Sequence, residues 1–282
     1  MSSASPSADT VFNRVRQDLA CGISLLTRIP VGWLLTRKQK DATAPWSLAR
    51  SIWCWPIVGA AIGALTGGFL CLMEALSIAS LPAAGVALAA QGMITGAFHE
   101  DGLADMADSY GAQTRERKLD IMRDSRIGSY GVLALCLSIL IRAGAMAAFP
   151  AAFLIPILAV SACVSRAVML WLPRLLPAAR PDGVARALSP LPRMPFIGAQ
   201  LVAIAITLGS LVCASFYREG PDGLPHALMV GCVVWVSAGL GTALVGFSAR
   251  KQLAGYTGDV LGASVSVAEC LVLATLTAFF QN

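Results

Sequence analysis

Charged residues are scarce in this sequence, and their scarcity argues against most soluble folds. Asp, Glu, Lys and Arg make up 13% of the 282 residues, about half the usual fraction of a soluble domain. Hydrophobic residues make up 56%, and apolar runs of about 18 to 22 residues recur, long enough to cross a bilayer as helices. The composition therefore predicts an all-α, multi-pass membrane protein.

The sequence also lacks paired cysteines and other marks of secreted, repeat or nucleic-acid-binding proteins. The eight cysteines are scattered singly with no Cys-x-x-Cys pair, so we interpret them as small core residues rather than disulfides or metal ligands. No cleavable signal peptide, internal repeat or low-complexity tract is evident. The net charge of +5 is not a sign of nucleic-acid binding here, and no nucleic-acid partner is expected.

Seven membrane spans are predicted from the apolar runs. They are Ile52–Leu72, Leu81–Phe98, Gly131–Phe149, Ala152–Leu172, Phe196–Phe216, Ala227–Phe247 and Val260–Phe280. The second is the weakest, because it is short and continues directly into an acidic motif. The whole chain, 1–282, is expected to form a single integral-membrane catalytic domain, with a bundle over 51–282.

The N-terminal segment, 1–50, is expected to lie at the cytoplasmic surface of the membrane. Apolar residues recur there at helical spacing, with charged residues between them. The apolar positions are Val11, Val15, Leu19, Ile23 and Leu26. This pattern predicts an interfacial amphipathic helix in contact with the lipid bilayer.

The distribution of positive charge predicts the orientation. Eighteen of the 21 Lys and Arg residues fall before the first span or after the second, fourth and sixth. Because positive charge marks cytoplasmic loops, the loops 99–130, 173–195 and 249–259 are expected to share the cytoplasmic face. Residues far apart in the sequence would then meet at one site.

An acidic cluster begins at His99. Seven of the sixteen acidic residues fall within twenty-five positions, and Asp101, Asp105 and Asp108 have the i, i+4, i+7 spacing of one helix face. Such a stripe repels itself unless a cation binds, and carboxylate oxygens suit Mg²⁺. We predict that Glu100, Asp101, Asp105 and Asp108 bind this metal. A solvated acidic loop is the alternative, and His99 could be a general base, a ligand or an orienting residue.

A second cluster, at 118–131, combines carboxylates with phosphate-binding groups. Asp120 and Asp124 could form a further carboxylate pair, while the cationic side chains and the glycine before the next span could bind an anion. The predicted phosphate-binding residues here are Lys118, Arg123, Arg126 and Gly128. Ordinary ion pairing within a helix would explain the same charges.

A third constellation lies at the start of the last span. Gly258 permits close approach of a ligand to the backbone, and Asp259 could bind metal or a substrate hydroxyl. Glu269 lies within the span, where a carboxylate is costly and suggests function. A structural ion pair with Arg142 or Arg166 is the competing interpretation.

Together these residues predict metal-assisted transfer of a phosphorus group at a membrane interface, with catalytic roles for the carboxylates. A bound cation would neutralise a diphosphate, and Arg and Lys would stabilise the transition state. The predicted catalytic residues are Asp101, Asp105, Asp124 and Asp259. A cation transporter, with the acidic cluster as an ion path, is an alternative from another class.

The motifs resemble those of the cobalamin synthase (adenosylcobinamide-GDP ribazoletransferase) family. The resemblance covers nearly the whole chain, and its five motifs occur in family order. They lie at 26–31, 55–59, 99–108, 122–131 and 256–263. Ser109 and Tyr256 depart from residues frequent in the family, without loss of charge. A fainter similarity, with different spacing, connects the acidic motifs to the CDP-alcohol phosphotransferases, which make lipids.

The resemblance implies an enzyme of the bacterial inner membrane that requires Mg²⁺. It would join adenosylcobinamide-GDP to α-ribazole or α-ribazole 5′-phosphate and release GMP, with the ribose 3′-hydroxyl as nucleophile. A homo-oligomer is compatible with this expectation.

Overall fold

The computed structural model describes residues 8–40, 46–220 and 223–280. Helices account for 82% of the chain. The described residues contain no strand, only an isolated parallel bridge between Ala178 and Tyr256. The predicted all-α class is confirmed.

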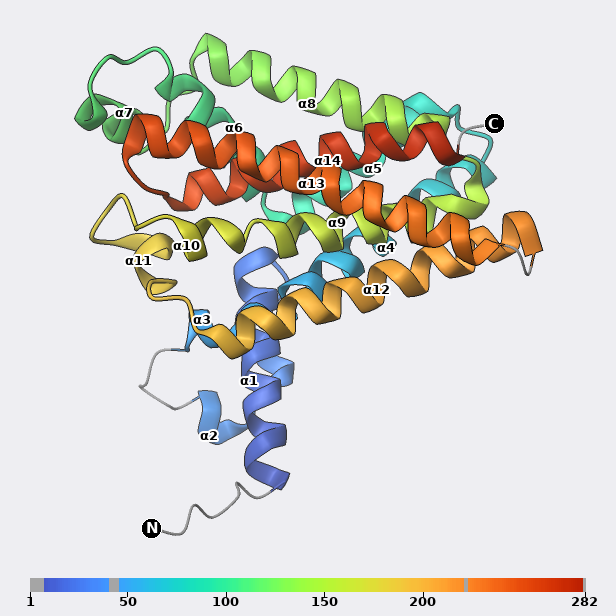
Figure 1. The fold of residues 1–282 in the computed structure, drawn as a ribbon, viewed down its shortest axis with the longest axis horizontal. Coiled ribbons are helices and arrows are strands. Elements are labelled where there is room, and N and C mark those ends of the chain that lie inside the picture. Colours follow the sequence, from blue (N-terminus) through green and yellow to red (C-terminus); the bar gives the residue numbers. More distant parts are fainter. Residues whose placement is uncertain (1–7, 41–45, 221–222, 281–282) are drawn as a thin grey trace.

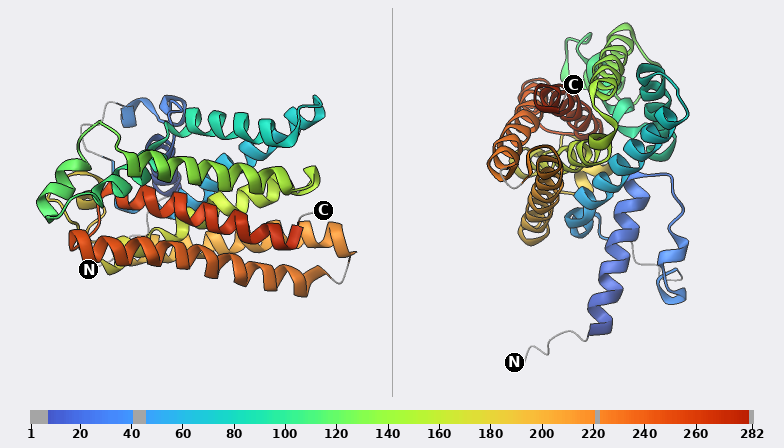
Figure 2. Two further views of the ribbon diagram at one scale, coloured as in Figure 1. Left: turned by 90° about the horizontal axis from the view of Figure 1, so that it is seen from above. Right: turned by 90° about the vertical axis from the view of Figure 1, so that its right-hand side faces the viewer.

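Long apolar helices form a bundle whose members run side by side (Figure 2). These helices are α4 (Trp55–Ala75), α5 (Ser80–Thr95), α8 (Ser129–Ala148), α9 (Ala151–Val168), α12 (Arg193–Glu219), α13 (Gly223–Leu253) and α14 (Gly258–Phe280). The shorter elements are α1 (Ala8–Leu26), η1 (Gly32–Leu34), α2 (Arg37–Lys40), α3 (Leu48–Ser51), η2 (Ile52–Cys54), α6 (Phe98–Ser109), α7 (Arg115–Ile121), α10 (Trp171–Leu175) and α11 (Gly183–Ala187).

Six helical segments of the described chain are long and apolar enough to cross a membrane, and a bent pair makes up to seven. The bent pair is α5 with α6, whose axes differ by 94°. Gly96 (φ 72°) and Ala97 (φ 56°) both adopt left-handed backbone conformations between them, which end α5 because a helix cannot continue through such residues. The predicted span Leu81–Phe98 is therefore wrong at its end, since it stops at Thr95.

The segment predicted as an acidic loop, 99–130, is also corrected. Its first part is helix α6 and its middle is helix α7. Thr114 starts α7 by accepting a hydrogen bond from the Arg117 N–H at 3.3 Å, as expected of an N-cap threonine. The acidic motif is thus held on a regular helix with a fixed face.

The two ends of the bundle differ in character. Helices α6, α7, α10 and α11 and the turn after α13 gather at one end, whereas the C-terminus lies at the other (Figure 1). Helix α1 points away from the bundle, across the direction of the long helices (Figures 1 and 2). Its Asp18 accepts hydrogen bonds from Arg50 (2.6 Å) and Trp53 (3.1 Å), which attach α1 to α3 and η2, just before α4.

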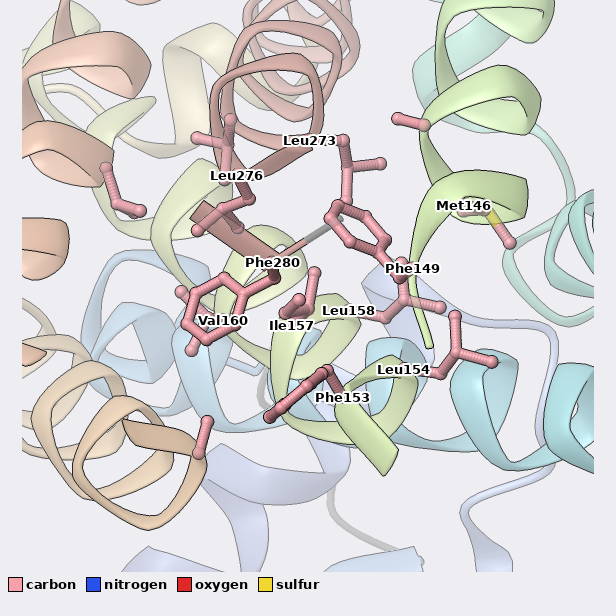
Figure 3. Packing of buried hydrophobic residues seen from close by; sticks show 14 of the residues in the cluster. Met146, Phe149, Phe153, Leu154, Ile157, Leu158, Val160, Leu273, Leu276 and Phe280 are labelled. Carbon is pink, nitrogen blue, oxygen red and sulfur yellow. The ribbon is translucent and has the colours of Figure 1, made fainter. Parts of the chain in front are cut away.

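Helix α9 is the most buried of the six candidate spans. Glycines at four-residue spacing on α4, Gly59, Gly63 and Gly67, face its backbone so closely that a methyl group at any of them would overlap it. Small residues at such spacing let membrane helices approach. Near the C-terminal end, Phe153, Phe280 and other large apolar side chains pack between α8, α9 and α14 (Figure 3). This core fixes the helices whose other ends carry the candidate site.

Candidate active site

Helix α6 crosses the start of α14 at close contact. A methyl group at Gly102 would lie 2.6 Å from the carbonyl oxygen of Asp259, and one at Gly262 would lie 3.0 Å from that of Phe98. The absence of side chains at both positions lets the two helices approach. Asp101 and Asp105 are thereby brought to the same place as Asp259, although more than 150 positions separate them in the sequence.

A polar cavity of about 620 Å³ opens at this crossing. Its charged lining residues are Arg28, Glu100, Asp101, Asp105, Arg123, Asp124, Arg126 and Asp259. Four of the carboxylates come from α6 and α14, whereas Asp124 and two of the arginines come from the segment between α7 and α8. The predicted meeting of the acidic and basic motifs at one site is observed.

A second hollow of about 370 Å³, here called the apolar cavity, adjoins the first. Its walls include Leu26, Trp55, Phe98 and Met169, and it is also lined by His99, Asp101, Gly258 and Asp259. Asp101 and Asp259 line both hollows. The site thus has a charged compartment and an apolar one, with two carboxylates at their junction.

Asp101 and Asp105 differ from the other carboxylates of the site because they lack a cationic partner. Among the residues that the structure describes, neither lies within 4.0 Å of a Lys, Arg or His nitrogen. They lie one helical turn apart on α6, so their charges repel each other. This arrangement is unfavourable unless a cation joins it.

Glu100 and Asp108 are already engaged by the protein. Glu100 forms a 2.9 Å ion pair with Arg142 of α8. Asp108 accepts hydrogen bonds from the backbone N–H groups of Gly128 (2.7 Å) and Gly131 (2.8 Å), so it caps the start of α8. In the described part of the chain, no group of three or more His, Cys, Asp or Glu side chains is arranged to hold a metal ion.

Asp259 has weaker partners than those two residues. It accepts a hydrogen bond from the Thr257 hydroxyl at 3.1 Å, and the Arg180 guanidinium lies 3.6 Å away. Gly258 beside it lines a third, smaller hollow of about 190 Å³ together with Arg180 and Asp182. Asp259 therefore lies where all three hollows meet.

The predicted phosphate-binding residues are divided by the structure. Arg123 and Arg126 line the polar cavity and form exposed ion pairs with Asp182 (3.0 Å) and Asp124 (2.6 Å). Such pairs are weak in water and are easily exchanged for a ligand. Lys118 lines neither cavity but donates to the Gln252 amide oxygen at 2.7 Å.

The two aspartates of the second motif also separate. Asp120 is exposed on α7 and lines none of the three hollows. Asp124 lines the polar cavity, where hydrogen bonds from the Arg126 side chain and backbone lower the pKa of its carboxyl to about 2. A carboxylate with so low a pKa is a weak base, so Asp124 is better suited to holding Arg126 than to accepting a proton.

Two arginines of the site have no role in the sequence analysis. Arg28 lines the polar cavity with its guanidinium 4.2 Å from the centre of the Phe98 ring. Arg180 donates to the Leu119 carbonyl at 2.7 Å and reaches toward Asp259. Arg28 belongs to the motif at 26–31, which indicated the family in the sequence analysis but did not indicate a role for this residue.

Glu269, the intramembrane carboxylate, is held by both candidate arginines. It forms ion pairs with Arg166 and, at 3.3 Å, with Arg142. Arg142 also pairs with Glu100, and an Arg166 nitrogen lies 3.3 Å from Nδ1 of His99. The five residues form a buried ion-pair network that joins α6 to α8, α9 and α14, as the structural interpretation of Glu269 predicted.

Comparisons with known protein sequences identify a family. Residues 18–277 match the profile of a family described as cobalamin-5-phosphate synthase. A protein of Bradyrhizobium diazoefficiens named adenosylcobinamide-GDP ribazoletransferase is 37% identical over 97% of this chain and 98% of its own length. Relatives of the same name from Allorhizobium ampelinum and Rhizobium etli are 33% and 38% identical over 92% of this chain and 95% of theirs. No solved structure gives a significant match.

Proposed function

The chain belongs to the cobalamin-5-phosphate synthase family, and from this premise we propose that it acts as an adenosylcobinamide-GDP ribazoletransferase. It transfers the cobinamide phosphate of adenosylcobinamide-GDP to α-ribazole or its 5′-phosphate and releases GMP. One observation carries this proposal above all. Asp101 and Asp259 line the charged and the apolar cavity together, so two different substrates could meet there.

The polar cavity is suited to the diphosphate. Arg28, Arg123 and Arg126 line it and can donate several hydrogen bonds to phosphate oxygens. Arg126 is largely exposed at 85% of its side chain, so it can turn toward a ligand at little cost. The large cobinamide group would remain outside, at the membrane surface.

The apolar cavity is suited to the flat base of ribazole. Trp55, Phe98 and Met169 provide apolar contact on its walls. A base held there would bring its ribose toward the junction of the cavities. In this proposal Asp101 and Asp259 orient the attacking hydroxyl and accept its proton; their position on the lining of both cavities supports these roles.

We propose Mg²⁺ as the cofactor, and the donor set fits it. Asp101 and Asp105 provide carboxylate oxygens with no cationic partner among the described residues, and Asp259 can join them. Mg²⁺ commonly binds through one or two carboxylates together with waters and phosphate oxygens, so a site without a complete protein cage is compatible with it. When bound, it would neutralise charge on the diphosphate. Glu100 and Asp108 stay predicted ligands, although their present partners favour structural roles.

We also propose that the site faces the cytoplasm of a bacterial cell and that the chain resides in the inner membrane. The basic segments after α6 and α9 and the basic last turn of α13 all lie at the end of the bundle that carries the site (Figure 1), and the positive-inside rule associates such an end with the cytoplasm. No observation favours the transporter, because Glu269 is paired with two arginines rather than lying on an open path.

The test is an assay of GMP release by the purified, detergent-solubilised protein. Adenosylcobinamide-GDP should release GMP only when α-ribazole or its phosphate is present. CDP-diacylglycerol offered together with an alcohol acceptor should release no CMP; release of CMP from this pair, without release of GMP from adenosylcobinamide-GDP, would favour the lipid-forming alternative. Excess chelator should stop turnover and added Mg²⁺ should restore it, while full activity in chelator would contradict the metal assignment.

A further inference from the structure

His99 lies between the apolar cavity and the buried ion-pair network, and the mechanism above does not use it. The residue lines the apolar cavity and is about nine-tenths buried. Nδ1 lies 3.3 Å from an Arg166 guanidinium nitrogen. One side of the imidazole therefore faces a protein cation, which leaves the other side for a ligand.

The contact with Arg166 decides which ring nitrogen carries the proton. A guanidinium group has only N–H donors and no acceptor, so Nδ1 has to accept and is unprotonated. The neutral imidazole then carries its proton on Nε2. Arg166 cannot turn away, because Glu269 pairs with it and the Ala162 carbonyl (3.2 Å) and Ser165 hydroxyl (3.1 Å) lie against it. The network thus fixes the tautomer.

We propose that His99 is a substrate-binding residue that donates its Nε2–H to an acceptor atom of the ligand in the apolar cavity. Arg166 is the positioning residue that holds this tautomer. The acceptor is an oxygen or an unprotonated ring nitrogen of an otherwise apolar, aromatic molecule. The inference rests on the proposed function, in which that molecule is α-ribazole or its phosphate, and it excludes His99 as the general base.

The mostly apolar lining of the apolar cavity explains why the Nε2–H of His99 would affect which ligands bind. The indole N–H of Trp55 is already used by the Ser51 hydroxyl at 3.1 Å, and Phe98 and Met169 offer no donor. The remaining hydroxyl on the lining, that of Ser24, belongs to an exposed residue that water can reach. A buried donor left without an acceptor is costly. His99 would therefore select ligands that carry an acceptor at the matching position over ligands of the same shape that lack one.

Two isosteric replacements test the position of the donor. The side-chain amide of His99→Gln reaches the place of Nε2, whereas that of His99→Asn ends near Nδ1. We expect His99→Asn to raise KM for α-ribazole phosphate about tenfold, as loss of one net hydrogen bond does. His99→Gln should stay near the wild-type value, and neither should change KM for adenosylcobinamide-GDP. Equal KM values in both variants, or a parallel rise for both substrates, would overturn the inference.

A spectroscopic measurement tests the tautomer independently of turnover. The chain has only two histidines, so His226→Asn leaves His99 as the one imidazole for ¹⁵N-histidine solid-state NMR in proteoliposomes. We expect a protonated Nε2 and an unprotonated Nδ1. A ring protonated at Nδ1, or at both nitrogens, would overturn the inference about His99 but not the proposed function. A wild-type protein that releases no GMP would instead overturn the proposed function.

Discussion

Helix α6 carries carboxylates in two different environments, which differ in whether an arginine pairs with the carboxylate. Glu100 lines the polar cavity too, but its carboxylate pairs with Arg142 and so joins the network in which Arg142 and Arg166 neutralise Glu269. On the side of the polar cavity, Asp101 and Asp105 have no such partner in the described part of the chain. Paired carboxylates stabilise the fold, whereas those at the cavity without a cationic partner remain available to a ligand.

The difference follows from the solvent available to each group. Inside the bundle, an uncompensated charge is too costly to keep, so Glu269 takes two arginines. At the cavity, water can solvate the carboxylates until a cation and a substrate replace it. Neutralising a carboxylate at the polar cavity should therefore reduce activity more than stability. Neutralising one in the buried ion-pair network should reduce stability more than activity.

Removal of a cavity carboxylate should have the largest effect on activity. We expect Asp105→Asn or Asp101→Asn to lower kcat about 10³-fold, on the order of 4 kcal/mol, because the metal loses a charged ligand. The thermal midpoint should stay unchanged or rise, since a repulsion is removed. The GMP assay and a melting curve measure both. Glu116→Gln, on the exposed start of α7, is the matched control; near-normal activity in both Asp variants would refute the metal site.

Neutralisation of Glu269 should give the reverse pattern. Glu269→Gln leaves two buried arginines with one carboxylate fewer, which should cost about 3 kcal/mol of stability. We expect a lower melting temperature and a lower yield of folded protein, while the kcat of the folded fraction falls less than in Asp105→Asn. A fully stable but inactive Glu269→Gln protein would show that the network is catalytic, and the contrast between the regions would disappear.

The contact between α6 and α14 should be sensitive to one methyl group. Gly102→Ala places a carbon 2.6 Å from the Asp259 carbonyl oxygen, so the helices must separate, at a cost of about 2 kcal/mol. Activity should fall too, because the cavity carboxylates move apart. Gly92→Ala, where the added carbon meets no atom within 4 Å, is the control for helix substitution. Equal activity and stability in the two variants would argue against the close crossing.

The smallest effect is expected at Asp124. Asp124→Asn frees Arg126, so KM for adenosylcobinamide-GDP should change by only about twofold. The hydrogen bonds from Arg126 lower the pKa of Asp124 from 3.8 to about 2. Any stabilisation by this pair is therefore complete above about pH 4 and is lost only as the pH falls towards 2. A loss of activity as large as that of Asp105→Asn would make Asp124 a catalytic residue.

Much of this arrangement could be predicted from the sequence, because hydrophobic length and charge placement act locally. The spans other than the second were predicted with only small differences at their ends. The second span ends three residues earlier than predicted, because the left-handed residues Gly96 and Ala97 end α5. Hydropathy by itself does not locate such a break. The roles of Glu100 and Asp108 could not be separated either, because both belong to one acidic motif and their partners come from α8 and the turn before it.

By itself the sequence determined that this is a helical membrane protein with an acidic motif close to basic residues, because hydropathy and charge are properties of each segment alone. Only the tertiary structure decided which carboxylates remain available. Gly102 and Gly262 let α6 and α14 come into contact, and this contact brings Asp101, Asp105 and Asp259 to the lining of one cavity. Pairing of buried charges depends on helices distant in the chain, and sequence spacing does not encode that distance.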